Sequence, residues 1–257
     1  MKLCVIGNSH VSMIMRADPP EKFADLDLTF FAQPGRGPEG IQLHGAEIHA
    51  IGPDLCCVLR RLDMPQKLKL KDYDGFVLVG MTATFFAIMG MVADHRVFGW
   101  PGANTRVEAP YISEAAILAS LMAKIREGLS FDIVSKIRAV CDAPVVIAPQ
   151  PYPSEAVLKK SSRFSALKAI NEQGIGDKVA ALLDQAHREV FEAVEGVTIL
   201  PQPAKTIRHG FVTDETYMRG AGRLNAKSKQ PANDILHANG KYGAMILGEI
   251  RRVVTGG

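Results

Sequence analysis

The sequence predicts an α/β protein of three layers, α/β/α, in which a mainly parallel sheet of five strands lies between helices. Two observations predict this class. Short apolar runs with β-branched residues alternate with longer amphipathic stretches, which is typical of parallel strands joined by crossover helices. The composition, 47% hydrophobic and 22% charged, is that of a soluble globular protein, and 257 residues suffice to bury one core. We therefore expect a single domain over residues 1–257.

The apolar runs predict five strands, at residues 3–7, 28–31, 76–79, 145–148 and 197–200. Spacing of apolar residues at the helical period predicts three helices, at residues 113–129, 177–194 and 240–254. Asp177 follows the breaker at residues 174–176 and is expected to cap the second of these helices. Residues 41–71 fit either a hairpin or part of a crossover.

Residues 75–93 contain no charge and are nearly long enough to cross a bilayer. A membrane span is one interpretation. A strand that ends at Gly80, a polar turn at residues 82–84 and a short buried helix form the other. The β/α pattern on both sides favours the second interpretation, so we expect no span.

Three long loops rich in glycine and proline remain, at residues 33–40, 96–110 and 201–231. Each follows or lies close to the carboxyl end of a predicted strand. Open parallel sheets bind their ligands at this edge, so we expect the functional site there.

The charges and cysteines narrow the class of protein. Thirty Lys and Arg against 27 Asp and Glu leave a net charge of +3 with mixed signs, which gives no support for nucleic-acid binding. The four cysteines form no C-x-x-C pair, so no zinc site is expected. Met1 and Lys2 lead directly into a strand-like run without the regions of a signal peptide. We expect a cytoplasmic protein with reduced thiols.

Ser9 follows the first predicted strand and precedes a segment that can begin a helix. A serine at such a turn exposes its hydroxyl at the sheet edge, and the amides of the next turn face the group that the hydroxyl attacks. This is a suitable place for a nucleophile. The alternative is that Ser9 merely caps the helix, and this segment alone favours the cap.

Asp234 and His237 precede the last predicted helix. An Asp three residues before a His can hold one ring nitrogen and leave the other free to take a proton from a hydroxyl. The pair is a candidate base and orienting carboxylate. Taken alone it is a weak signal, because a loop Asp and His most often satisfy backbone groups.

The two ends together resemble the SGNH (GDSL-type) hydrolases. The run IGNSHV at residues 6–11 stands where that family has its Gly-Asp-Ser block, and DILHANGKYG at residues 234–243 is similar to its last block. The resemblance covers the strand order and both ends. It implies a flavodoxin-like α/β/α fold, with Ser9 as nucleophile, His237 as general base and Asp234 as its orienting residue.

The resemblance also implies three oxyanion donors: the Ser9 amide, a glycine amide after the second strand and an asparagine side chain after the third. Gly35 best fits the glycine, with Gly37 as the second choice. The third block departs from the family, because Gly80 matches but Thr82 stands in place of the asparagine. Either Thr82 or a loop residue such as Asn104 supplies this donor, or the chemistry differs.

Other residues receive weaker assignments. His10 lies next to Ser9, but consecutive residues at a helix start diverge by about 100°, which argues against it as the base. Trp100 either stacks on a sugar ring or packs its loop down, and we favour packing. Asn104 and Gln150 follow strands and are candidates for the substrate pocket. No metal is expected, because the remaining histidines lack ligand spacing.

The function that this sequence predicts is hydrolysis of an acyl ester by a Ser-His-Asp mechanism without a cofactor, on O-acetyl or similar groups of a carbohydrate. The alternative is a catalytically impaired protein of the same fold that binds glycan or assists polysaccharide assembly. A nucleotide-binding Rossmann protein is excluded, since the turn at residues 7–12 lacks the second and third glycines of G-x-G-x-x-G.

Overall fold

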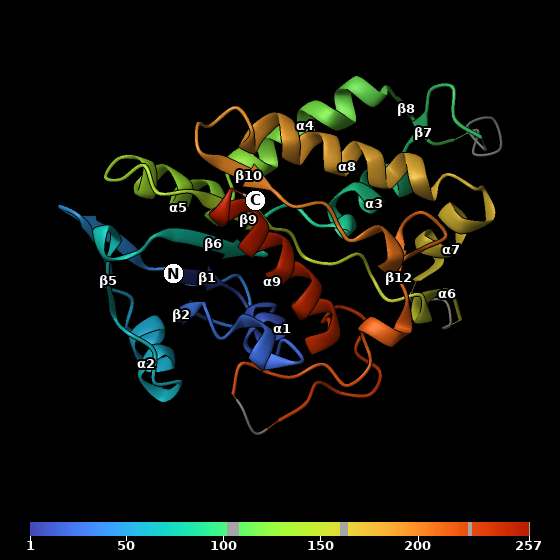
Figure 1. Ribbon diagram of the computed structural model, residues 1–257. Coiled ribbons are helices and arrows are strands. Elements are labelled where there is room, and N and C mark those ends of the chain that lie inside the picture. The colour runs from blue at the N-terminus through green and yellow to red at the C-terminus, as the bar shows by residue number, and fades with distance from the viewer. Residues whose placement is uncertain (102–107, 160–163, 226–227, 257) are drawn as a thin grey trace.

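The computed structural model describes residues 1–101, 108–159, 164–225 and 228–256. Its centre is a five-stranded sheet in which every pairing is parallel (Figure 1). The strands are β1 (Lys2–Gly7), β2 (Asp27–Ala32), β6 (Gly75–Val79), β9 (Val145–Ala148) and β10 (Val197–Ile199). Their order across the sheet is β10-β9-β6-β1-β2. The predicted fold class and all five predicted strands are confirmed.

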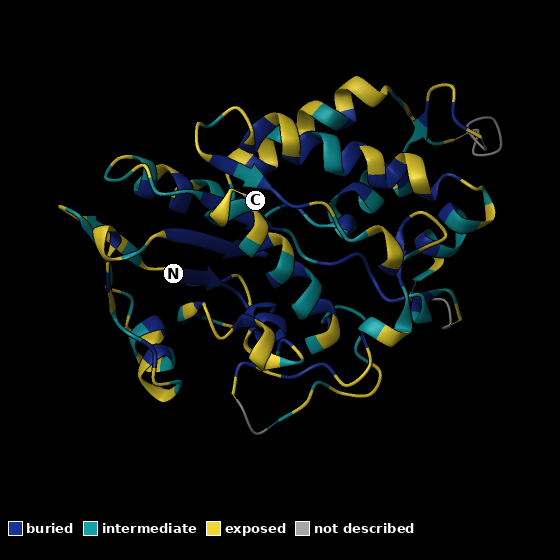
Figure 2. Cartoon of the chain, viewed as in Figure 1, coloured by how far each residue is buried: buried dark blue, intermediate teal, exposed yellow. Residues whose placement is uncertain are grey.

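Helices cover both faces of the sheet. The α-helices are α1 (Val11–Met15), α2 (Pro53–Arg61), α3 (Phe85–Asp94), α4 (Glu114–Arg126), α5 (Leu129–Arg138), α6 (Ala156–Lys159), α7 (Ser165–Glu172), α8 (Gly176–Phe191) and α9 (Gly240–Thr255). On one face α1 packs against α9, and on the other α3, α4 and α8 pack together (Figure 1). The inner strands β1, β6 and β9 are almost wholly buried (Figure 2), as expected for a parallel sheet covered on both sides, whereas the edge strand β2 is partly exposed.

Two helices differ from their predicted limits. The helix expected at residues 113–129 ends at Arg126, and a further helix that was not expected, α5, begins at Leu129 after Gly128, whose backbone is extended with ψ 154°. Asp177 does not cap α8: the cap is Ile175, and the Asp177 carboxylate accepts a hydrogen bond from the next amide within the first turn. At the first residue of the helix, Gly176, a side chain would collide with the ring of Phe211, so the position requires glycine.

Residues 41–71 form a hairpin rather than a crossover. Three strands pair antiparallel in the order β3-β4-β5, and α2 connects the second to the third. The smaller strands are β3 (Ile41–His44), β4 (Glu47–Ala50), β5 (Lys67–Lys69), β7 (Arg96–Val97), β8 (Tyr111–Ile112), β11 (Ile207–Arg208) and β12 (Val212–Thr213). The 3-10 turns are η1 (Pro20–Phe23), η2 (Leu70–Asp72), η4 (Ala204–Thr206) and η5 (Glu215–Tyr217).

The uncharged segment at residues 75–93 is a strand and a helix. It comprises β6 and most of α3, which is ten residues long. Within the described ranges no helix is long and apolar enough to cross a membrane.

Helices α1 and α9 approach each other closely because glycines face the contact. A Cβ added to Gly240 would collide with the carbonyl oxygen of Arg16, and one added to Gly243 with that of Met13. Ser9 lies just before α1 and His237 just before α9. The contact between the two helices therefore brings the ends of the chain that carry these residues together.

Candidate active site

Ser9, His237 and Asp234 form a continuous series of hydrogen bonds. The Ser9 Oγ lies 2.9 Å from Nε2 of His237, and Nδ1 of His237 lies 3.1 and 3.2 Å from the two carboxylate oxygens of Asp234. The side chains of His237 and Asp234 are 14% and 17% exposed. The structure thus brings together residues 228 positions apart in the arrangement of a nucleophile, a base and an orienting carboxylate.

The turn after β1 presents Ser9 without using its hydroxyl as a cap. Helix α1 begins at Val11, its cap residue is His10, and no side chain caps it. Asn8 holds the turn, since its amide donates to the Val79 carbonyl and its Oδ1 accepts from the His10 amide. The alternative role of Ser9 as a helix cap is therefore absent, and its hydroxyl pairs with His237 instead.

The carboxylate of Asp234 is held by a turn of its own. Its Oδ2 accepts hydrogen bonds from the amides of Leu236 and His237, at 3.3 and 2.8 Å. Burial acts to raise the pKa of Asp234, but the hydrogen bonds from the ring and amide of His237 outweigh it and lower the pKa. Asn239 accepts from the first amides of α9 and anchors the other end of the turn. The carboxylate stays ionised and fixes which nitrogen of His237 carries the proton.

His10 lies flat against His237. The two ring centroids are 4.7 Å apart and the planes differ by 20°. His10 is 4% exposed, its Nδ1 is buried without a hydrogen-bond partner, and the side chain of Gln150, just after β9, acts on its ring to raise its pKa. From the sequence, we expected His10 only as a rival base and Gln150 only as a residue of the substrate pocket. The adjacent Ser-His pair was the one signal of this contact, and it does not show which ring His10 would meet.

The turn at Ser9 and the loops after β2 and β6 contain backbone amides without a protein acceptor. In the described part of the chain, the amides of Ser9, Gly35, Gly37 and Thr82 donate to no protein acceptor. Gly35 is in open space, whereas a Cβ on Gly37 would lie 2.6 Å from the sulfur of Met81, beside the loop that follows β6. The structure therefore places the second choice, Gly37, against that loop rather than Gly35.

The hydroxyl of Thr82 is paired with a buried histidine of α8. Its Oγ1 lies 3.2 Å from Nε2 of His187, which is 2% exposed. Burial lowers the pKa of His187 to about 4, with a hydrogen bond to the Ala83 backbone opposing it, so the ring is neutral at pH 7. The His187 tautomer decides whether Thr82 donates to this ring or keeps its proton for a substrate. No sequence pattern indicates this pairing across 105 positions.

The turn that carries Thr82 is strained and held in place. Met81 has a φ of 61°, which a residue with a side chain adopts at a cost of about 1–3 kcal/mol. Ser130 at the start of α5 compensates, because its hydroxyl and amide donate to the carbonyls of Gly80 and Met81. Strain of this kind is found at functional turns, and here it lies at the carboxyl edge of the sheet beside Asn8.

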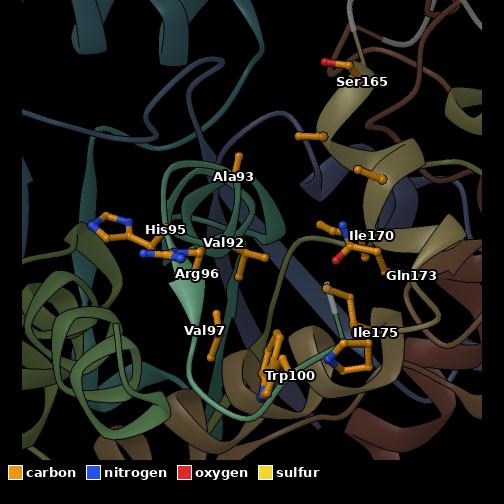
Figure 3. A pocket seen from close by; sticks show the side chains of 13 residues that line it. Val92, Ala93, His95, Arg96, Val97, Trp100, Ser165, Ile170, Gln173 and Ile175 are labelled. Atoms are coloured by element: carbon orange, nitrogen blue, oxygen red, sulfur yellow. The ribbon is translucent and has the colours of Figure 1, made fainter. Parts of the chain in front are cut away.

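Trp100 lies apart from Ser9 and His237. It is 6% exposed, its Nε1 donates to the Glu114 carboxylate, and Lys178 lies over its ring. Figure 3 shows Trp100 with Val92 and Ile175 around a cavity of about 270 Å³ to which no residue of the hydrogen-bonded series contributes. The packing role that we favoured for Trp100 is thus the one observed. Asn104 lies outside the described residues.

A polar cavity of about 250 Å³ lies at the loop that follows β2. It is formed by the 33–40 loop and the start of α2, and Gln33, Arg36 and Glu39 are among its lining residues. The Gln33 amide donates to the Gly7 carbonyl, two residues before Ser9, so this cavity adjoins the same edge of the sheet. Its polar lining suits a ligand rich in hydroxyl groups.

Within the part of the chain that the structure describes, no three His, Cys, Asp or Glu side chains are grouped to hold a metal ion. Comparisons of the chain with protein-family models, with curated proteins and with solved structures found no match. The assignment of a function therefore depends on the geometry of the site.

Proposed function

We propose that this chain is a serine esterase of the SGNH type. The observation that carries the proposal is the hydrogen bond of 2.9 Å between Ser9 Oγ and His237 Nε2, in a ring whose other nitrogen faces the ionised Asp234. A serine hydroxyl is a weak nucleophile until a neighbouring base takes its proton. His237 is placed to be that base, and Asp234 to hold the ring in the tautomer that accepts the proton.

The reaction has two steps. Ser9 Oγ attacks the ester carbonyl while His237 Nε2 takes the hydroxyl proton, and collapse of the tetrahedral intermediate transfers that proton to the leaving alcohol. Water then gives a proton to His237 and attacks the acyl-enzyme, which releases the acid and restores Ser9. The unpaired amides of Ser9 and Gly37 are the donors that we assign to the oxyanion, and the chemistry requires no cofactor.

The substrate class that we propose is an O-acetyl or similar small acyl group on a carbohydrate. The support is the polar cavity at the 33–40 loop, whose Gln33 amide bonds to Gly7; no residue of the hydrogen-bonded series lines it, and its Arg36 and Glu39 form an ion pair that sugar hydroxyls would have to join. Trp100 gives no support to this choice, because it is buried in a separate cavity.

Labelling with a fluorophosphonate tests the proposal. A hydroxyl with a positioned base and an oxyanion site reacts quickly with such a probe, so mass spectrometry should locate one adduct, on Ser9. Ser12→Ala is the matched control: Ser12 is 1% exposed and its hydroxyl has no partner, so this variant should label like the wild type. Labelling at another serine of folded protein, or none, contradicts the proposal.

A second candidate function is a glycan-binding or accessory protein of polysaccharide assembly with impaired catalysis. The observation that favours it is the contact of Thr82 with His187, which occupies the hydroxyl that replaces the expected asparagine. Isothermal titration with acetylated and deacetylated oligosaccharides, alongside an ester turnover assay, separates the two functions. Binding without turnover of any acyl ester supports the accessory role.

A further inference from the structure

The contact between His10 and His237 is built into the turn that presents the nucleophile. His10 follows Ser9 directly, its backbone amide is fixed by Asn8, and its ring is buried under that of His237. The side chain of Gln150, just after β9, is the neighbour that acts to raise the pKa of His10. His10, which follows β1, and His237, which precedes α9, thus stack on each other, with Gln150 after β9 as a neighbour of His10.

Hydrogen bonds alone leave one motion of the His237 ring poorly restrained. The bonds to Ser9 and Asp234 join opposite edges of the ring and act within its plane. Tilting of the ring out of that plane is resisted only by a contact on its face. The His10 ring, nearly parallel at 4.7 Å, provides that contact.

We propose that His10 is a positioning residue that holds the plane of the His237 ring in line with Ser9, and that Gln150 in turn holds His10. This inference rests on the proposed esterase function, in which His237 must stay aligned while it takes up and returns a proton. Misplacement of a reacting group by about 1 Å costs on the order of 10²-fold in rate. A contact that keeps the His237 ring from tilting can therefore change the reaction rate measurably.

The surroundings of His10 keep it neutral. Burial, followed by the nearby His237, lowers its pKa to about 3, whereas the side chain of Gln150 and the charge of Asp234 act in the opposite direction. A neutral ring can lie against His237 in both protonation states of the base. A charged ring would repel the imidazolium that forms during the reaction.

Four variants test the positioning role by the kinetics of p-nitrophenyl acetate hydrolysis. His10→Ala should lower kcat about tenfold with little change in KM, since the base is misaligned rather than removed. His10→Phe keeps a flat ring and should restore most of that loss. Gln150→Leu should give a smaller loss in the same direction. Leu121→Ala, a buried residue of α4 with no role in the site, should lower the melting temperature but leave kcat unaltered.

Proton NMR supplies a measurement that does not depend on esterase activity. The Nδ1 proton shared by His237 and Asp234 should give a downfield resonance in the wild type, broaden in His10→Ala and return in His10→Phe. An unchanged resonance in folded His10→Ala overturns the inference, as does equal damage to kcat by both His10 variants. If the wild type hydrolyses no ester, the proposed function fails, and this resonance still decides the positioning role.

Discussion

Gly243 of α9 lies directly against the backbone of Met13 in α1, so that an added Cβ would collide with the Met13 carbonyl oxygen. Because Ser9 precedes α1 and His237 precedes α9, this contact sets the separation of nucleophile and base. A side chain at position 243 would push the two helices apart.

Gly243→Ala should therefore lower both stability and activity. Forcing a methyl group into a filled contact costs about 1–3 kcal/mol in the free energy of unfolding. Gly248→Ala is the matched control in the same helix, where an added Cβ meets no atom within 4 Å, and it should stabilise by up to about 1 kcal/mol. Urea denaturation measures both variants. Equal effects would show that the close approach does not matter.

Thr82→Val tests the oxyanion assignment at the position where the sequence departs from the family pattern. If the Thr82 hydroxyl donates to the oxyanion, the variant should lower kcat by roughly 10²-fold with little change in KM, since this bond strengthens in the transition state. Thr82→Asn should then keep or raise activity. Thr84→Val, two residues further on, is the control and should leave kcat unaltered. An unaffected kcat in Thr82→Val means that its hydroxyl serves His187 alone.

The stability of the protein should fall as the pH is lowered from 6.5 towards 4. The pKa of His187 is about 4 in the folded chain, below the ordinary value, so in this window the unfolded chain binds a proton that the folded chain does not. Stability then rises with pH with a slope approaching ~1.4 kcal/mol per pH unit for this one group. His187→Gln should make the slope shallower, and the exposed His44→Gln should not. Parallel curves of unfolding free energy against pH for wild type and His187→Gln would refute this assignment.

The fold was largely predictable because its signals are local. Each strand of the central sheet is a short apolar run, and the C-terminal helix is marked by its apolar spacing; its cap, Asn239, appears in the structure alone. The end of a helix near Gly128 was predicted, whereas α5, which begins at the next residue, was not. The need for glycine at residue 176 depends on Phe211, which is distant in the sequence.

The site was predictable where its residues occur in short motifs. Ser9 and the pair Asp234 and His237 lie at two ends that a known pattern relates, and the structure brings them within hydrogen-bond distance. The contacts of His10 with His237 and of Thr82 with His187 join positions more than 100 residues apart. No periodicity or spacing encodes such pairs, because they arise from the packing of helices onto the sheet.

A mutant cycle on the hydrolysis of p-nitrophenyl acetate tests the central claim most directly. Ser9→Ala and His237→Ala should each lower kcat by about 10⁴-fold or more, and the double variant should be no slower than either, since nucleophile and base act as a unit. Asp234→Asn should be harmful but milder. Losses that multiply in the double variant, or a wild-type rate equal to that of Ser9→Ala, would contradict the assignment of Ser9 and His237 as nucleophile and base.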